Sequence, residues 1–161
     1  MRHLSKYVNF EIQEDSFLAL LSDDGMSKKS VYRNLKALHD FVELLNDMMP
    51  IELAMGCSAA LPFCAITNQL PQHSGTETVI AFASARNSHQ CNFFQVMRNL
   101  RLYLLQYFEQ TKTVFIFSDI WSPERFRESQ SELLFYGEKG VRIYGGLISA
   151  KQFVGVRLPY L

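Results

Sequence analysis

The sequence has little cysteine, no excess of either charge and no long apolar run, and each absence excludes a class of protein. Three cysteines are an odd number, and no apolar signal segment is evident at the start, so we do not expect a disulfide framework. The same pattern favours a reducing, cytoplasmic setting. No apolar stretch approaches the roughly 20 residues that span a bilayer, so we expect no membrane partner.

Charge and composition further restrict the class of protein to which the sequence can belong. Sixteen basic and sixteen acidic side chains cancel, so attraction to nucleic acid would require a local basic patch. Apolar residues make up 48% of the chain and aromatic residues 13%, which is enough to fill a core. The sequence shows no internal repeat and no long linker, so we expect residues 1–161 to form one domain.

Two unbroken apolar runs flank a predicted helix in the middle of the chain. Residues 78–83 and 112–117 show no apolar/polar alternation, so both faces of each strand should be buried. Between them, residues 93–108 place apolar side chains three and four positions apart, as a crossover helix does. The pattern predicts a central parallel βαβ unit over about 77–119, with both strands interior to the sheet.

Residues 27–49 form the clearest amphipathic helix of the sequence. Apolar residues recur at steps of three and four, Ser27 suits the N-cap, and Pro50 stops the helix. Basic residues fill its first half and acidic residues its second half, which is opposite to the preference of the helix dipole. The helix is available for dimerisation, so a homodimer is one expected assembly.

Shorter elements are predicted on both sides of these segments. Residues 7–12 alternate like an edge strand, and Asp15 or Ser16 can cap a short helix that follows. A helix that begins at Pro123 should end at Gly137.

The C-terminal part completes the predicted fold. Two short strands around a turn near 149–151 predict an antiparallel hairpin over about 141–159. The fold class is therefore α/β, in two or three layers, with a mixed sheet that contains a central parallel βαβ unit and a C-terminal antiparallel hairpin.

Residues 25–36 carry the best motif match. Gly25 is followed by an apolar residue, a capping serine and two inward-facing apolar positions, and this order resembles the turn and recognition helix of helix-turn-helix DNA-binding proteins. The resemblance implies DNA contacts by Lys28, Lys29, Tyr32, Arg33 and Lys36. An ordinary glycine turn before a capped amphipathic helix explains the same residues and is the preferred interpretation.

A second candidate site follows the two central strands. Ligands of open parallel sheets bind beyond the carboxyl ends of the strands, and polar residues gather there. They form a plausible site for a small polar or anionic ligand: Ser84, Arg86, Asn87, Ser88, His89, Ser118, Asp119 and Trp121. Polar loops that merely cap the next helix are the alternative.

The sequence contains no complete catalytic or metal motif. Its cysteines and histidines lack ligand spacing, so we predict no metal and no cofactor. The strand, helix and strand order resembles a restriction-endonuclease-like core. Glu77 stands only at the entrance of the first strand, with Val79 two residues later, so such a core would be inactive.

The sequence therefore favours a non-catalytic, cytoplasmic regulatory or sensory domain that binds a small ligand or a protein partner. A helix-turn-helix-like DNA-binding regulator that uses residues 25–36 is the alternative. A divergent or inactive nuclease or hydrolase acting at the edge that holds Ser84 and Asp119 is the third hypothesis.

Overall fold

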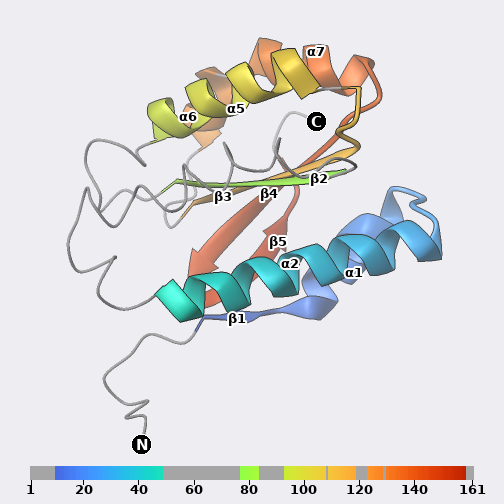
Figure 1. The fold of residues 1–161 in the computed structure, drawn as a ribbon, viewed down its shortest axis with the longest axis vertical. Helices are drawn as coiled ribbons and strands as arrows, with labels where there is room; N and C mark the ends of the chain where they lie inside the picture. The colour runs from blue at the N-terminus through green and yellow to red at the C-terminus, as the bar shows by residue number, and fades with distance from the viewer. Residues whose placement is uncertain are drawn as a thin grey trace, which may run out of the picture.

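A computed structural model describes residues 10–48, 77–83, 93–107, 109–118, 123–128 and 130–158. In this part of the chain, five strands form one mixed sheet with helices on both of its faces (Figure 1). The strands are β1 (Glu11–Ile12), β2 (Thr78–Ala83), β3 (Thr113–Ser118), β4 (Arg142–Ser149) and β5 (Gln152–Val156), and the helices are α1 (Glu14–Asp23), α2 (Lys28–Met48), α5 (Phe93–Tyr107), α6 (Pro123–Glu128) and α7 (Gln130–Glu138). None of these helices has both the length and the apolar character that a membrane span requires.

The strand order is β1-β5-β4-β3-β2. Strands β2, β3 and β4 are parallel neighbours, and β4 and β5 form an antiparallel hairpin. The predicted α/β class, the parallel βαβ unit and the C-terminal hairpin are therefore confirmed. The short strand β1 lies at one edge of the sheet, where it pairs in parallel with β5.

Strand β3 lies between β2 and β4, so its predicted interior position is confirmed. Strand β2 is the last strand in the described order, but Ile80 and Phe82 make further interactions beyond those described, so the interior position of β2 stays a prediction. The apolar run of β2 reflects burial of its two faces, because Val79 and Ile80 point in opposite directions and are both buried. Burial of the two faces of a strand does not show whether another strand pairs with its edge.

The sheet is the middle of three layers. Helices α5, α6 and α7 cover one face, and α1 and α2 cover the other (Figure 1). The regular apolar spacing of α5 becomes a buried stripe at Val96, Met97, Leu100, Tyr103 and Leu104. On the opposite face, the ring of Phe41 from α2 stacks on Phe117 of β3 at a centroid distance of 6.4 Å.

The connection between α1 and α2 is set by two local signals. Helix α1 ends in a Schellman motif, in which the Met26 N–H donates to the Leu21 carbonyl at 3.2 Å. Gly25 has a φ of +72°, as that motif requires. Ser27 then caps α2 as predicted, because its Oγ accepts the Ser30 N–H at 3.3 Å.

Two predicted helix ends are corrected by the structure. Helix α1 begins at Glu14 with Gln13 at the N-cap, and the Ser16 hydroxyl donates to the Gln13 carbonyl at 2.7 Å instead of capping the helix. The same hydroxyl oxygen accepts the Gly155 N–H at 2.9 Å, which ties α1 to β5.

The segment that begins at Pro123 forms two helices, α6 and α7, and α7 continues through Gly137 to Glu138. Gly140 supplies the left-handed residue that follows the helix, with a φ of +96°.

Candidate functional site

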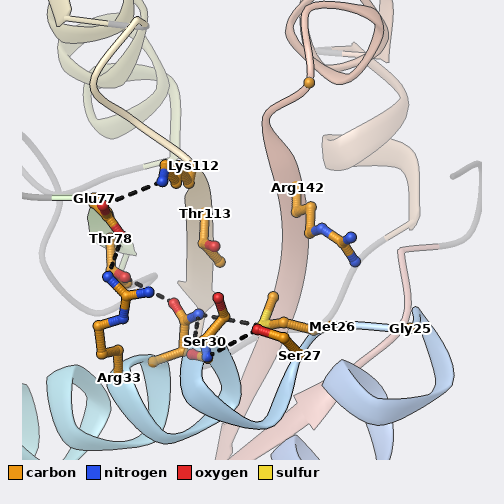
Figure 2. A pocket seen from close by; sticks show the side chains of 12 residues that line it. Gly25, Met26, Ser27, Ser30, Arg33, Glu77, Thr78, Lys112, Thr113 and Arg142 are labelled. Carbon is orange, nitrogen blue, oxygen red and sulfur yellow. Dashed lines mark hydrogen bonds and ion pairs between the residues drawn. The ribbon is translucent and has the colours of Figure 1, made fainter.

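A pocket of about 520 Å³ lies at the amino ends of β2, β3 and β4, beside the turn between α1 and α2 (Figure 2). The sheet register makes this edge, because Thr78, Thr113 and Arg142 are aligned as the first residues of the three parallel strands. All three line the pocket. Twelve residues line it in total, and the remainder come from the α1–α2 turn, the start of α2 and the residues just before the strands.

Two cations share one carboxylate on one side of the pocket. The Glu77 Oε2 atom lies 3.2 Å from Arg33 Nη1, and its Oε1 lies 3.3 Å from Lys112 Nζ. The backbone holds Glu77 in place, because its carbonyl accepts the N–H groups of Lys112 at 2.8 Å and Thr113 at 3.0 Å. Glu77 therefore connects α2 to the entrance of β3.

Arg142 occupies the other side of the pocket (Figure 2). Its Nη1 donates to the backbone carbonyl of Asp24 at 2.8 Å. Within the described ranges, no carboxylate lies at ion-pair distance from its guanidinium, and the Asp24 carboxylate lies 3.6 Å from Arg157 instead. Three cationic side chains and one carboxylate line the pocket, so its lining carries an excess of two positive charges.

Partly buried hydrogen bonds connect α2 to β2 at the wall of the pocket. The Thr78 hydroxyl donates to Asn34 Oδ1 at 2.7 Å, and Asn34 Nδ2 donates to the Ser30 carbonyl at 2.8 Å. Asn34 is only 4% exposed, so these bonds satisfy an amide that would otherwise be buried without partners. The sequence contained a signal for this residue, because Asn34 lies three positions after Val31 and four before Leu38, within the apolar stripe.

Tyr144 lies two residues after Arg142 on the same face of β4. It is 3% exposed, and its hydroxyl lies near the Asp24 carboxylate and the Arg142 guanidinium without a hydrogen bond of standard geometry. Burial, with a further contribution from the Asp24 carboxylate, raises the pKa of Tyr144 from 10.0 to about 12. The phenol therefore stays neutral near pH 7.

The five side chains of the helix-turn-helix interpretation are all exposed on α2: Lys28, Lys29, Tyr32, Arg33 and Lys36. Of these, only Arg33 lines the pocket. Lys36 pairs with Asp40 along the helix at 3.1 Å, and Tyr32 is 69% exposed. One of the five side chains therefore lines the pocket, and the other four lie at the surface away from its lining.

The predicted site at the carboxyl ends of the strands falls mostly outside the described residues. Ser118 is described and is 1% exposed at the end of β3. The other members lie outside the described ranges: Ser84, Arg86, Asn87, Ser88, His89, Asp119 and Trp121. That site stays a prediction.

The guanidinium, ammonium, amide and hydroxyl groups of the described pocket can hold an anion by charge-assisted hydrogen bonds. In the part of the chain that the structure describes, no three His, Cys, Asp or Glu side chains gather as a metal site would need.

Comparison with protein-family models, with curated proteins and with solved structures finds no match to this chain.

Proposed function

We propose that this chain is a non-catalytic regulatory or sensory protein that binds a small anionic ligand in the pocket at the amino ends of β2, β3 and β4. The observation that carries the proposal is the position of Arg142, which lines the pocket and has no carboxylate partner among the described residues. A guanidinium has five donors in a planar fork that matches carboxylate and phosphate groups. A bond to the Asp24 carbonyl and a contact with the Tyr144 hydroxyl engage part of this fork, and its remaining donors are available to a ligand.

The rest of the pocket supports the same ligand class. The excess of two positive charges favours an anion, and Ser27, Thr78 and Thr113 add hydroxyl groups that can accept or donate. The amino end of α2 opens on the pocket at Ser27, where the helix dipole also favours negative charge. A volume of about 520 Å³ suits a metabolite-sized molecule that carries a carboxylate or a phosphate.

Solvent exposure limits the strength of this binding. The side chains of Arg33 and Lys112 are 49% and 67% exposed, so their interactions with an anion are screened by water and salt. We expect weak binding at high ionic strength and stronger binding at low ionic strength.

A thermal-shift screen tests the proposal. Phosphate, small phosphate esters and small mono-, di- and tricarboxylates are compared with chloride at equal ionic strength. We expect at least one of them to raise the melting temperature, because a ligand that binds only the folded state stabilises it. The shift should be lost in Arg142→Gln and retained in Arg98→Gln, since Arg98 is an exposed cation on α5, on the opposite face of the sheet. If no anion stabilises the protein beyond chloride, the proposed ligand class is wrong.

DNA binding is a second candidate, supported by the exposure of Lys28, Lys29 and Tyr32 on the outward side of α2. Basic and aromatic side chains on an exposed helix can contact phosphates and base edges. A mobility shift with mixed-sequence duplex DNA at low salt tests it. The shift should disappear in Lys28→Glu combined with Lys29→Glu and persist in Arg98→Glu. If the wild type gives no shift even at low salt, this candidate is excluded.

A further inference from the structure

Glu77 is placed where a bound anion would be expected to interact. Both of its carboxylate oxygens face cations that line the pocket, Arg33 at 3.2 Å and Lys112 at 3.3 Å. These two cations come from α2 and from the residue before β3, so the carboxylate bridges two elements across one side of the pocket (Figure 2).

Hydrogen bonds hold the backbone of Glu77, and exposed ion pairs hold its side chain. Two N–H groups of the β3 entrance donate to its carbonyl, which fixes the start of β2. Its carboxylate, by contrast, makes exposed ion pairs, and its side chain is 34% exposed. Exposed ion pairs of this kind contribute little to stability, so breaking them costs little.

We propose that Glu77 is an internal competitor for the anionic ligand, which sets the affinity and the charge selectivity of the pocket. In the free protein, Glu77 neutralises one of the three cations. A ligand that carries one negative charge can bind to Arg142 while Glu77 keeps Arg33 and Lys112. A ligand with a higher negative charge gains more, because it can also displace the Glu77 carboxylate from those two cations.

This inference rests on the proposed anion site, and it deepens it by naming a ligand class. Small anions that carry two or more negative charges should bind more tightly than anions with one charge. The carboxylate of Glu77 repels every anion in the pocket, so its removal should strengthen binding of all of them.

Calorimetric titration of inorganic phosphate at low ionic strength tests the proposal. We expect Glu77→Gln to bind phosphate about fivefold or more tightly than the wild type, the factor that corresponds to one like-charge interaction at contact distance in water. The matched control is Glu132→Gln, because Glu132 forms a similar exposed ion pair with Arg101 at 2.9 Å but between α7 and α5. The control should bind phosphate as the wild type does.

A double variant separates competition from a structural role. Arg142→Gln removes one cationic side of the pocket, and Glu77→Gln frees the two cations of the other side. If Glu77 competes with the ligand, Glu77→Gln should restore part of the phosphate affinity that Arg142→Gln loses. Glu77→Thr, which is neutral and suits a strand entrance, replaces Glu77→Gln in both comparisons if the glutamine variant does not fold.

The outcomes distinguish failure of the competition by Glu77 from failure of the anion site itself. If the wild type binds phosphate and both neutral variants at position 77 bind it equally or more weakly, Glu77 is a structural bridge and the competition is refuted, while the anion site stands. If neither the wild type nor the position 77 variants bind phosphate, the anion site itself is refuted and the competition with it.

Discussion

The ring of Phe117 lies where a β-carbon on Gly146 would stand. A β-carbon built at Gly146 would meet Phe117 Cδ1 at 2.1 Å and Cε1 at 2.2 Å, and the two residues are register partners on β3 and β4. Phe117 is completely buried and also contacts the rings of Phe17, Phe41 and Phe153. The glycine therefore provides the space for the aromatic cluster between the sheet and the α1–α2 layer.

Gly146→Ala should destabilise the protein by about 2 kcal/mol or more, because Phe117 has to move within a packed aromatic cluster. Gly137→Ala is the matched control, since no atom lies within 4 Å of a β-carbon at this helical position. The control should stabilise the protein by about 0.5–1 kcal/mol through helix propensity. Urea denaturation measures both changes. Equal stability of Gly146→Ala and the wild type would show that the described packing of Phe117 is wrong.

Asn34→Ala should reduce the stability by about 1–3 kcal/mol, because it removes the partly buried bond to Thr78 and leaves that hydroxyl without its acceptor. Thr78→Val should reduce the stability less in the Asn34→Ala variant than in the wild type, since in that variant it removes a hydroxyl that has lost its acceptor. A double-mutant cycle by chemical denaturation measures the coupling. Strictly additive effects would show that the two side chains do not interact.

Tyr144→Phe should leave stability near pH 7 nearly unchanged, because the buried hydroxyl makes no hydrogen bond of standard geometry that the substitution would remove. The stabilities of the wild type and Tyr144→Phe should diverge at alkaline pH. Between pH 10 and about 12, the unfolded phenol loses its proton while the folded phenol keeps it, so the unfolded state binds fewer protons and stability falls as the pH rises.

The decline should be smaller in Tyr144→Phe, and Tyr32→Phe, at a residue that is 69% exposed, should follow the wild type. Denaturation curves at a series of alkaline pH values make the comparison. Parallel declines in all three proteins would refute the raised pKa of Tyr144.

The elements that could be predicted are those marked by a local sequence pattern, such as an apolar run, a helical spacing of apolar residues or a capping residue. The apolar run of β3 and the spacing of α5 report burial directly, and Ser27 marks the start of α2 by its capping bond. The apolar run of β2 could not predict its position in the sheet, because its alternating residues are buried on both faces whether or not a further strand pairs with its edge.

The pocket was harder to predict than the fold. Ligands of open parallel sheets usually bind beyond the carboxyl ends of the strands, so the sequence predicted a site there. The described pocket lies at the amino ends. Its key contact joins Arg33 and Glu77, which are 44 positions apart, and no local pattern relates residues at that separation. Residues 25–36 were singled out for a different role, and Gly25, Ser27 and Arg33 of this segment line the pocket. Asn34 within the apolar stripe of α2 was a further local signal, since a buried amide requires hydrogen-bond partners.

The most direct test of the anion site is a phosphate titration followed by amide resonances in ¹H–¹⁵N spectra at low ionic strength. We predict that the largest changes fall on residues that line the pocket, including Ser27, Ser30, Thr78 and Thr113, and that they disappear in Arg142→Gln but persist in Arg98→Gln. Changes centred on α5 and α7, on the opposite face of the sheet, or changes that Arg142→Gln leaves intact, would contradict the account.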